Sequence, residues 1–177
     1  MKLSEALKIV SDGDIVFVFP NRTSSFIDKA ISWWEGPNTP FHCGLLAWQI
    51  KYGLPQLMVC QMTPDHKNLV SIDDYAANRL HIIKRPNGLN IDGNGLISRV
   101  SSISYSMPGA LASGIVQYLP MFTVFKSRKT KFCSQYVADV YNHQGFTPTI
   151  PDWLDPFKLE QFLLKAGLQK LEIDAKL

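Results

Sequence analysis

A cysteine at the start of an expected helix is the residue of this chain best placed to act as a nucleophile. The helix is predicted over residues 131–141, because apolar side chains recur there at the spacing of one buried helical face: Phe132, Tyr136, Val137, Val140 and Tyr141. Cys133 falls on the first turn, where the helix dipole and unpaired N–H groups favour the nucleophilic thiolate. Cys133 also fits an ordinary buried position on a core helix, since free cysteines are commonly buried.

Two polar residues in apolar, strand-like stretches can complete such a site. His42 lies near the beginning of the stretch 40–48, and an imidazole that reaches Cys133 would act as general base. Gln61 lies among apolar residues in the stretch 56–62, where its amide would orient His42. Each also has an ordinary interpretation: His42 as a satisfied core or edge residue, and Gln61 as a solvent-facing residue of a half-buried strand.

Further groups are candidates for oxyanion stabilisation or substrate binding. The backbone N–H of Cys133 is the first expected oxyanion donor, and Ser134 follows it on the same turn. Tyr105 is a second candidate contributor, and it fits ordinary core packing as well. Of the adjacent Trp33 and Trp34, one belongs in the core and the other lines a cleft or lies on the surface; Trp34 is the candidate for substrate binding.

A short basic segment, residues 126–131, precedes Cys133. It is either a solvated loop or a source of positive potential that lowers the thiol pKa and attracts an anionic substrate.

The rest of the chain is expected to form a sheet that positions these side chains. Residues 15–19 are apolar on both faces, which predicts a central strand. Further strands are expected at 40–48, 56–62, 80–85 and near the C-terminus, with His81 and Lys84 pointing out of the core. Expected helices are a first one capped by Ser4, 23–34, 71–76, 96–104, the Cys133 helix, and a last one that begins with the cap Asp155 and Pro156 and ends at Gly167. This pattern predicts the α+β class.

The composition is that of a globular protein. Hydrophobic residues make up 46% of the 177 residues and charged residues 19%, which fits one domain over residues 1–177. The net charge of +3 does not imply a nucleic-acid partner. Three irregularly spaced cysteines and the lack of CxxC or HExxH patterns predict no disulfide framework, no metal site and no cofactor. We expect no membrane span and no signal peptide, hence synthesis in the cytoplasm.

The order of these features resembles a known superfamily. A His-bearing strand and a Gln-bearing strand precede a Cys-bearing helix, as in the circularly permuted papain-like branch of the NlpC/P60 superfamily (YiiX/YebB-like, related to the lecithin:retinol acyltransferases). The resemblance covers roughly residues 10–145 and rests on five stretches: GDIVFVF, FHCGLLAW, LMVCQM, SYSMPG and KFCSQYVADVY. The chain departs from the family pattern at four positions: Phe41 for Ser, Gln61 and Gln135 for Glu, and Phe132 for Tyr.

The resemblance implies a fold and an activity. The fold would be a papain-like antiparallel sheet with the Cys-bearing helix packed against it. The activity would be that of a thiol hydrolase, a cysteine peptidase or amidase acting on peptidoglycan stem peptides through Cys133, His42 and Gln61. Gln61 can accept a hydrogen bond from the imidazole but cannot stabilise imidazolium with a full charge.

Two other functions remain open. The chain can be a lipid thioesterase or acyltransferase, or a catalytically inert papain-like structural module such as a virion component. A role at the cell wall would require delivery by a phage particle or a secretion apparatus.

Overall fold

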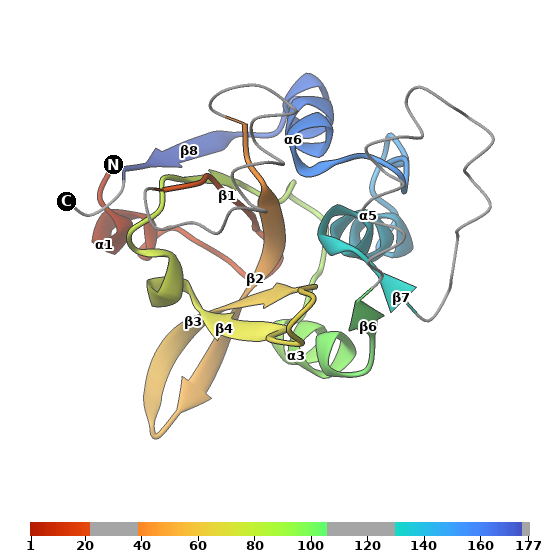
Figure 1. Ribbon diagram of the computed structural model, residues 1–177. Helices are drawn as coiled ribbons and strands as arrows, with labels where there is room; N and C mark the ends of the chain where they lie inside the picture. The colour runs from red at the N-terminus through yellow and green to blue at the C-terminus, as the bar shows by residue number, and fades with distance from the viewer. Residues whose placement is uncertain (22–38, 106–129, 175–177) are drawn as a thin grey trace.

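The computed structural model describes residues 1–21, 39–105 and 130–174, and the side chains of Tyr105 and Thr130 are not among the described groups. The chain is α+β, with a six-stranded antiparallel sheet and a few helices (Figure 1). The expected helix at 23–34, the segment 126–129 and Trp34 lie outside the described residues.

The sheet has the strand order β4-β3-β2-β1-β5-β8, and every neighbouring pair is antiparallel. Its strands are β1 (Ile15–Val18), β2 (His42–Lys51), β3 (Leu54–Gln61), β4 (Leu69–Ser71), β5 (Leu80–Ile83) and β8 (Lys170–Ile173). Strand β1 lies between β2 and β5 and is buried along its whole length, which confirms the prediction of a central strand. The short edge strand β4 was not predicted.

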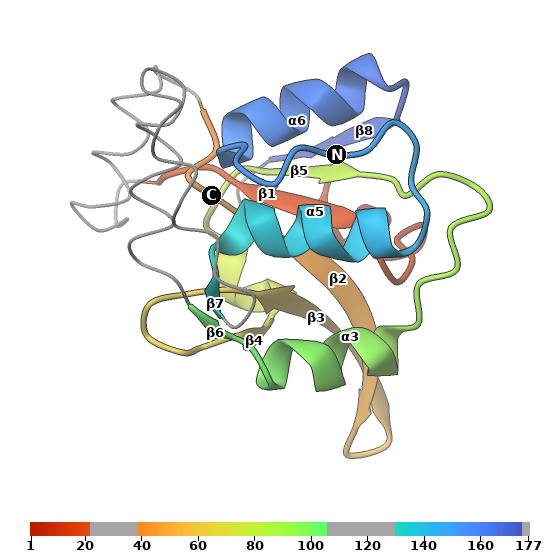
Figure 2. The same ribbon diagram turned by 90° about the vertical axis from the view of Figure 1, so that its right-hand side faces the viewer.

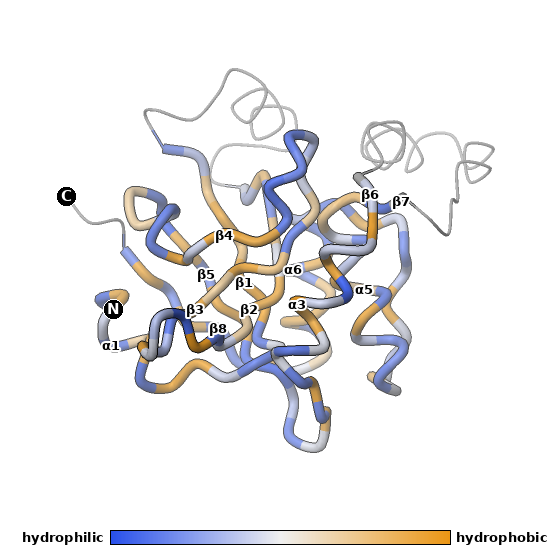
Figure 3. The backbone as a smooth tube through the Cα atoms, turned by 90° about the horizontal axis from the view of Figure 1, so that it is seen from below, coloured by the Kyte–Doolittle hydropathy of each residue, from blue (hydrophilic) through white to orange (hydrophobic). Residues whose placement is uncertain are grey.

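Two layers of helices enclose the sheet. Helices α3 (Gly93–Ser101), α5 (Cys133–His143) and α6 (Pro156–Lys165) bury their apolar residues against one face (Figure 2). Helix α1 (Leu3–Ala6) and the 3-10 helix η1 (Ile72–Tyr75) cover the other face. Hydrophobic residues accordingly concentrate in the central strands, and hydrophilic residues in the connecting loops (Figure 3). The strands β6 (Ser104–Tyr105) and β7 (Thr130–Lys131) form a separate parallel pair next to the start of α5.

Local sequence signals place several boundaries. Strands β2 and β3 form a hairpin whose turn residues, Tyr52 and Gly53, both have positive φ, at 53° and 77°. Helix α6 begins as predicted: the Asp155 carboxylate accepts a hydrogen bond from the N–H of Lys158 at 2.7 Å, and Pro156 is the first helical residue. Gly167, with φ of 85°, follows its last turn.

The predicted cap of the first helix is wrong. Helix α1 begins at Leu3, so that Ser4 lies inside the first turn and is not its cap. The Glu5 carboxylate instead accepts a hydrogen bond from the N–H of Lys2 at 3.1 Å. The Glu5 carboxylate therefore satisfies a backbone N–H group at the start of the helix, and its negative charge is favourable at the positive end of the helix dipole.

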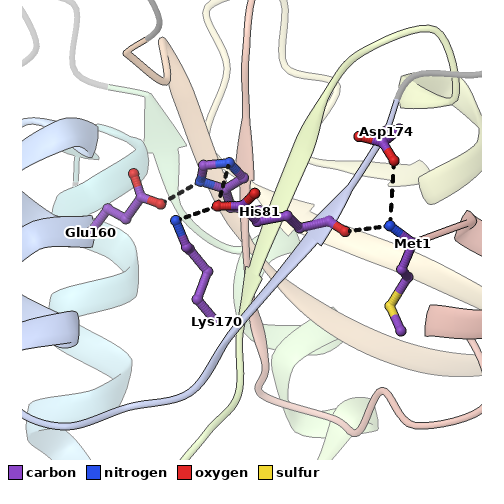
Figure 4. A network of polar contacts seen from close by, with 6 residues as sticks. Met1, His81, Glu160, Lys170 and Asp174 are labelled. Carbon is purple, nitrogen blue, oxygen red and sulfur yellow. Dashed lines mark hydrogen bonds and ion pairs between the residues drawn. The ribbon is translucent and has the colours of Figure 1, made fainter.

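The predicted outward orientation is also wrong for His81, whereas Lys84 is half-buried at the margin of the sheet. The His81 side chain is buried beneath α6, and its Nδ1 lies 2.5 Å from the Glu160 carboxylate (Figure 4). The Lys84 ammonium lies 2.5 Å from the carboxylate of fully buried Asp14. Strand alternation predicts which face a side chain occupies, but α6 covers the face that His81 occupies, so this direction does not lead to water.

The N-terminus is held against the last strand. The Met1 ammonium donates hydrogen bonds to the Glu172 carbonyl at 3.0 Å and to the Asp174 carboxylate at 3.4 Å (Figure 4). Lys170 and Glu172 form an ion pair at 2.6 Å on β8, which occupies the position of the expected C-terminal strand. Among the described helices none is long and apolar enough to cross a bilayer.

Candidate active site

The sheet and α5 position Cys133 as the first residue of a helix. Phe132 precedes it in an extended conformation and is buried, which fixes the point at which the chain enters the helix. Phe132 has no polar side chain, so no side-chain cap occupies the N–H groups of the first turn. These N–H groups and the helix dipole favour negative charge at the sulfur and on a substrate oxygen beside it.

Helix α5 is fixed on the sheet by packing and by hydrogen bonds. Tyr136, Val137 and Tyr141 are fully buried against the strands. The Tyr141 hydroxyl donates to the Gly13 carbonyl at 2.8 Å, which ties the far end of α5 to the start of β1. The Ser134 hydroxyl donates to the Leu154 carbonyl at 2.5 Å, in the loop before α6. A helix held at both ends gives the Cys133 sulfur a defined position.

His42 and Gln61 come from adjacent strands. His42 is the first residue of β2, and Gln61 is the last residue of β3. The His42 Nε2 lies 2.9 Å from Gln61 Oε1, and the exposed fraction of Gln61 is 2%, so Gln61 is not a solvent-facing residue. Gly44 lies opposite Gln61, and a Cβ atom there would be 3.2 Å from Gln61 Cβ. The glycine therefore leaves room for the glutamine side chain on this face.

The hydrogen bonds of Gln61 determine which nitrogen of His42 carries a proton. Gln61 Nε2 donates to the Lys67 carbonyl at 2.8 Å, and the Tyr75 hydroxyl donates to Gln61 Oε1 at 2.7 Å. The amide oxygen therefore faces His42 and can only accept, so Nε2 of the imidazole carries hydrogen. In the neutral ring Nδ1 is then the basic nitrogen, the one that can accept a proton from a thiol.

The Cys133 thiol is in an environment that favours its ionisation. A hydrogen bond from the Cys43 side chain lowers the pKa of Cys133 well below its usual value, burial opposes this, and the charge and hydrogen bond of His42 lower it further. Burial raises the pKa of the Cys43 thiol well above its usual value, and the hydrogen bond with Cys133 raises it further. Of the two sulfurs, Cys133 therefore carries the negative charge and Cys43 keeps its proton.

Two consecutive residues of β2 reach the same sulfur. His42 and Cys43 leave the strand toward opposite faces of the sheet. Both residues contribute to the lowered pKa of Cys133, so its sulfur lies near the start of β2. Cys133 and His42 are each 8% exposed, which makes the site a nearly enclosed cluster of sulfur and imidazole.

The remaining predicted residues are placed to different degrees. Ser134 has its hydroxyl proton committed to the Leu154 carbonyl, which leaves its backbone N–H as the group available to a substrate. The backbone of Tyr105 pairs with Lys131, two residues before Cys133, while its side chain lies outside the described groups. Lys131 forms an ion pair with Asp139 at 2.6 Å, so its charge is partly neutralised.

Two residues near the site, Cys43 and Tyr75, were not predicted from the sequence. Cys43 was one of three cysteines without regular spacing, and Tyr75 belonged to a short expected helix. The one sequence feature that could have pointed to Cys43 is its position next to His42. Adjacent residues of a strand point to opposite faces of the sheet, so this position did not predict a role at the same site. Tyr75 reaches Gln61 only because η1 packs beside β3.

A pocket of about 810 Å³ follows the outer side of α5. Gln135 and Asp139 line it together with residues 149–153, and they leave the helix on the side opposite Cys133. The pocket is therefore separate from the thiol cluster. Within the described residues no group of three or more histidine, cysteine or acidic side chains could hold a metal ion.

Neither a scan against models of known protein families nor a comparison with curated proteins found a match for this chain.

Proposed function

We propose that this protein is a cysteine hydrolase that cleaves amide bonds with Cys133 as nucleophile and His42 as general base. The observation that carries the proposal is the placement of Cys133 at the N-terminus of α5, where His42 acts on its thiol, together with the distance of 2.9 Å between His42 Nε2 and Gln61 Oε1. A helix N-terminal thiol of lowered pKa beside an oriented imidazole is the arrangement that activates cysteine nucleophiles.

The chemistry has two stages. The Cys133 thiolate attacks the carbonyl carbon, and the N–H groups of the first turn of α5 stabilise the resulting oxyanion. Imidazolium at His42 gives its proton to the leaving amine, and a thioester remains on Cys133. His42 then takes a proton from water, the hydroxide attacks the thioester, and the carboxylic acid leaves as the thiolate is regenerated.

Gln61 supports this cycle as a neutral orienting group. Its oxygen fixes the ring and the tautomer of His42 through the 2.9 Å hydrogen bond. Because the amide carries no charge, it stabilises imidazolium less than a carboxylate does. The protein is therefore expected to work over a lower or narrower pH range than a thiol enzyme with a Cys-His-acid triad.

The fold and substrate class belong to the same proposal. A sheet bearing His42 and Gln61 that precedes a helix bearing Cys133 supports a circularly permuted papain-like domain of the NlpC/P60 type. That resemblance suggests the stem peptides of peptidoglycan as the substrate, reached by delivery in a phage particle or through a secretion apparatus. The substrate would be cleaved as an amide and without a cofactor.

The test compares the protein with three variants on purified peptidoglycan and on soluble muropeptides. We expect the protein to release new amino groups and Cys133→Ala to release none. His42→Ala should lower the rate by about 10²- to 10⁴-fold, the usual contribution of a general base. Cys60→Ala is the matched control, because Cys60 is a buried cysteine of the adjacent strand that does not contribute to the pKa shift of Cys133. Undiminished release by Cys133→Ala would remove this residue from the chemistry.

Two other functions would give different experimental results. A fatty acyl thioester on Cys133, detected by mass spectrometry after incubation with lipid, would indicate a lipid thioesterase or acyltransferase. If iodoacetamide labels Cys133 no faster at neutral pH than a model thiol, the protein is an inert papain-like module.

A further inference from the structure

We propose that the tip of the β2–β3 hairpin, residues 50–55, is a docking surface for the headgroup region of an anionic lipid membrane. The proposal goes beyond the hydrolase function and does not depend on Cys133. The tip includes Lys51, the last residue of β2, whereas His42 is the first residue of that strand. A membrane in contact with the tip therefore lies at the other end of β2 from the thiol cluster.

Large apolar side chains are exposed together at this tip. Ile50 and Leu54 are each 70% exposed, and Tyr52 is 94% exposed. They are three of the six large hydrophobic side chains that are exposed in the described part of the chain, and they lie within five positions. Single exposed apolar residues are normal on a protein surface, whereas a cluster of them marks an interaction site.

Tyr52 has a backbone conformation that is unfavourable for an aromatic residue. Its φ of 53° lies in the left-handed region, which two-residue hairpin turns normally fill with asparagine, aspartate or glycine. Because the side chain is 94% exposed, packing within the fold does little to offset this strain. A strained residue that the fold does not need points to a function, here a contact outside the chain.

The tip is apolar on both faces of a two-stranded ribbon. Lys51 pairs with Leu54, and Ile50 pairs with Pro55, so these two pairs point to opposite faces. In two perpendicular views the tip extends beyond the other described elements (Figures 1 and 2). A projecting ribbon of this kind is covered on both faces when lipid encloses it, whereas a flat protein surface would cover only one face.

A polar pair directly behind the tip limits the depth of insertion. Gln49 and Gln56 oppose each other there, and both are half-buried. Three residues per strand at about 3.3 Å each give an apolar tip of about 10 Å, which matches the depth at which interfacial segments lie in a membrane. At this depth water and lipid headgroups satisfy the outward-facing backbone groups of the ribbon.

The charge of the tip favours anionic lipid. Lys51 is exposed, and its ammonium lies 5.8 Å from the centroid of the Tyr52 ring. No acidic residue occurs between Glu35 and Asp65, and the chain carries a net charge of +3. A lysine can keep its ammonium among anionic headgroups while its stem lies along apolar surface, and the amphipathic ring of tyrosine suits the same layer.

The experiment measures co-sedimentation of the full chain with vesicles of phosphatidylcholine, with and without phosphatidylserine. We expect binding to the mixed vesicles that weakens as salt is added. Ile50→Ser and Leu54→Ser should each lower the partition coefficient by about tenfold, and Lys51→Gln by about fivefold. Ile9→Ser is the matched control, because Ile9 is an isoleucine outside the hairpin that is 48% exposed, and it should bind like the unaltered protein.

Two substitutions of Tyr52 separate a membrane contact from a structural role. Tyr52→Asn suits the left-handed turn position, so it should raise the thermal transition temperature while lowering vesicle binding by about tenfold. Tyr52→Trp keeps an amphipathic ring, and its added indole emission should shift to shorter wavelength with mixed vesicles. A structural role alone would lower stability in Tyr52→Asn and leave the emission of Tyr52→Trp unchanged by lipid.

Several results would overturn the proposal. The unaltered protein could fail to bind the mixed vesicles, or folded Ile50→Ser and Leu54→Ser could bind as well as Ile9→Ser. Loss of binding in Lys51→Gln alone would indicate electrostatic adsorption without insertion of the tip. Dissociation of an oligomer by the tip substitutions, without an effect on vesicle binding, would assign the tip to contacts between copies of this chain.

The hydrolase proposal is tested separately. The rate at which iodoacetamide alkylates Cys133 should be the same in the folded tip variants as in the unaltered protein, because the tip and His42 lie at opposite ends of β2. A loss of vesicle binding therefore leaves the role of Cys133 untouched, and an unreactive Cys133 leaves the docking surface untouched.

Discussion

The His42 Nε2 lies 2.9 Å from Gln61 Oε1, and the Tyr75 hydroxyl donates to the same oxygen at 2.7 Å. An uncharged amide therefore occupies the position in which a carboxylate would hold an imidazolium. Three hydrogen bonds fix that amide, because Gln61 Nε2 also donates to the Lys67 carbonyl. The amide therefore orients the His42 ring but does little to stabilise imidazolium.

Replacing Gln61 by Glu should raise the pKa of His42. A carboxylate would keep its contacts with His42 and Tyr75 and would add a full charge that favours imidazolium. Its second oxygen would face the Lys67 carbonyl in place of a donor, so stability should fall by about 1–3 kcal/mol. NMR titration of the His42 ring and denaturant unfolding measure the two effects. An unchanged His42 titration would show that the residue at position 61 does not act on the imidazole.

The three cysteines should differ sharply in their reaction with iodoacetamide. The pKa of Cys133 is lowered, mainly by the hydrogen bond from Cys43, whereas burial raises the pKa of Cys43 and raises that of Cys60 to about 12. At neutral pH we expect label on Cys133 alone in the folded protein and on all three after denaturation. Equal labelling of Cys60 and Cys133 in the native state would contradict a lowered pKa at Cys133 and a raised pKa at Cys60.

The same pKa shift has a stability consequence with a definite sign. Because the pKa of Cys133 is lower in the folded protein than in the unfolded chain, ionised Cys133 contributes stability that is complete above the unfolded thiol pKa of about 8.5. That contribution is lost as the pH falls through the folded pKa. Cys133→Ala should therefore weaken this part of the pH dependence of unfolding, and Cys60→Ala should not.

Asp14 is expected to be an acidic residue on which the stability of the fold depends strongly. It is fully buried and accepts hydrogen bonds from the N–H groups of Ser11 and Arg85, both at 2.9 Å, and from Lys84 at 2.5 Å. Asp14→Ala leaves the ammonium of Lys84 without its buried partner and should cost about 3–5 kcal/mol. Denaturant unfolding measures the loss.

Two controls make the Asp14 prediction specific. Asp65→Ala removes the exposed ion pair with Lys67 and should change stability by less than about 1 kcal/mol. Asp14 lies at the end of β1 away from the Val18–His42 pair, so the rate of Cys133 alkylation should be unaffected in folded Asp14→Ala. Equal losses of unfolding free energy in Asp14→Ala and Asp65→Ala would contradict the prediction.

The pair formed by His81 and Glu160 should show strong coupling. The two side chains are buried and 2.5 Å apart, between β5 and α6. His81→Leu or Glu160→Leu alone leaves a buried polar partner and should cost about 3–5 kcal/mol, whereas the double variant should lose clearly less than the sum. A double-mutant cycle from denaturant unfolding measures the coupling, and additive losses would indicate that the pair does not act as a unit.

The sequence pattern was sufficient to predict those helices and strands that depend on residues close together in the chain. The apolar run at 15–18 determined a central strand, and Asp155, Pro156 and Gly167 determined both ends of α6. The helical spacing after Phe132 likewise put Cys133 on the first turn of α5. Capping, turn geometry and periodicity depend on neighbours in the chain, so the sequence contains them.

Contacts across the fold were decided by the tertiary structure. Alternation along β5 could not show that α6 covers His81, nor could it show that Lys84 meets Asp14. The same limit applies at the candidate site, where neighbouring Cys43 and His42 both lower the pKa of Cys133, about ninety residues further along the chain. Residue type and order fixed which groups were available for chemistry, and only the packing of α5 against the edge of the sheet decided which of them meet, because their separation along the chain carries no information about distance.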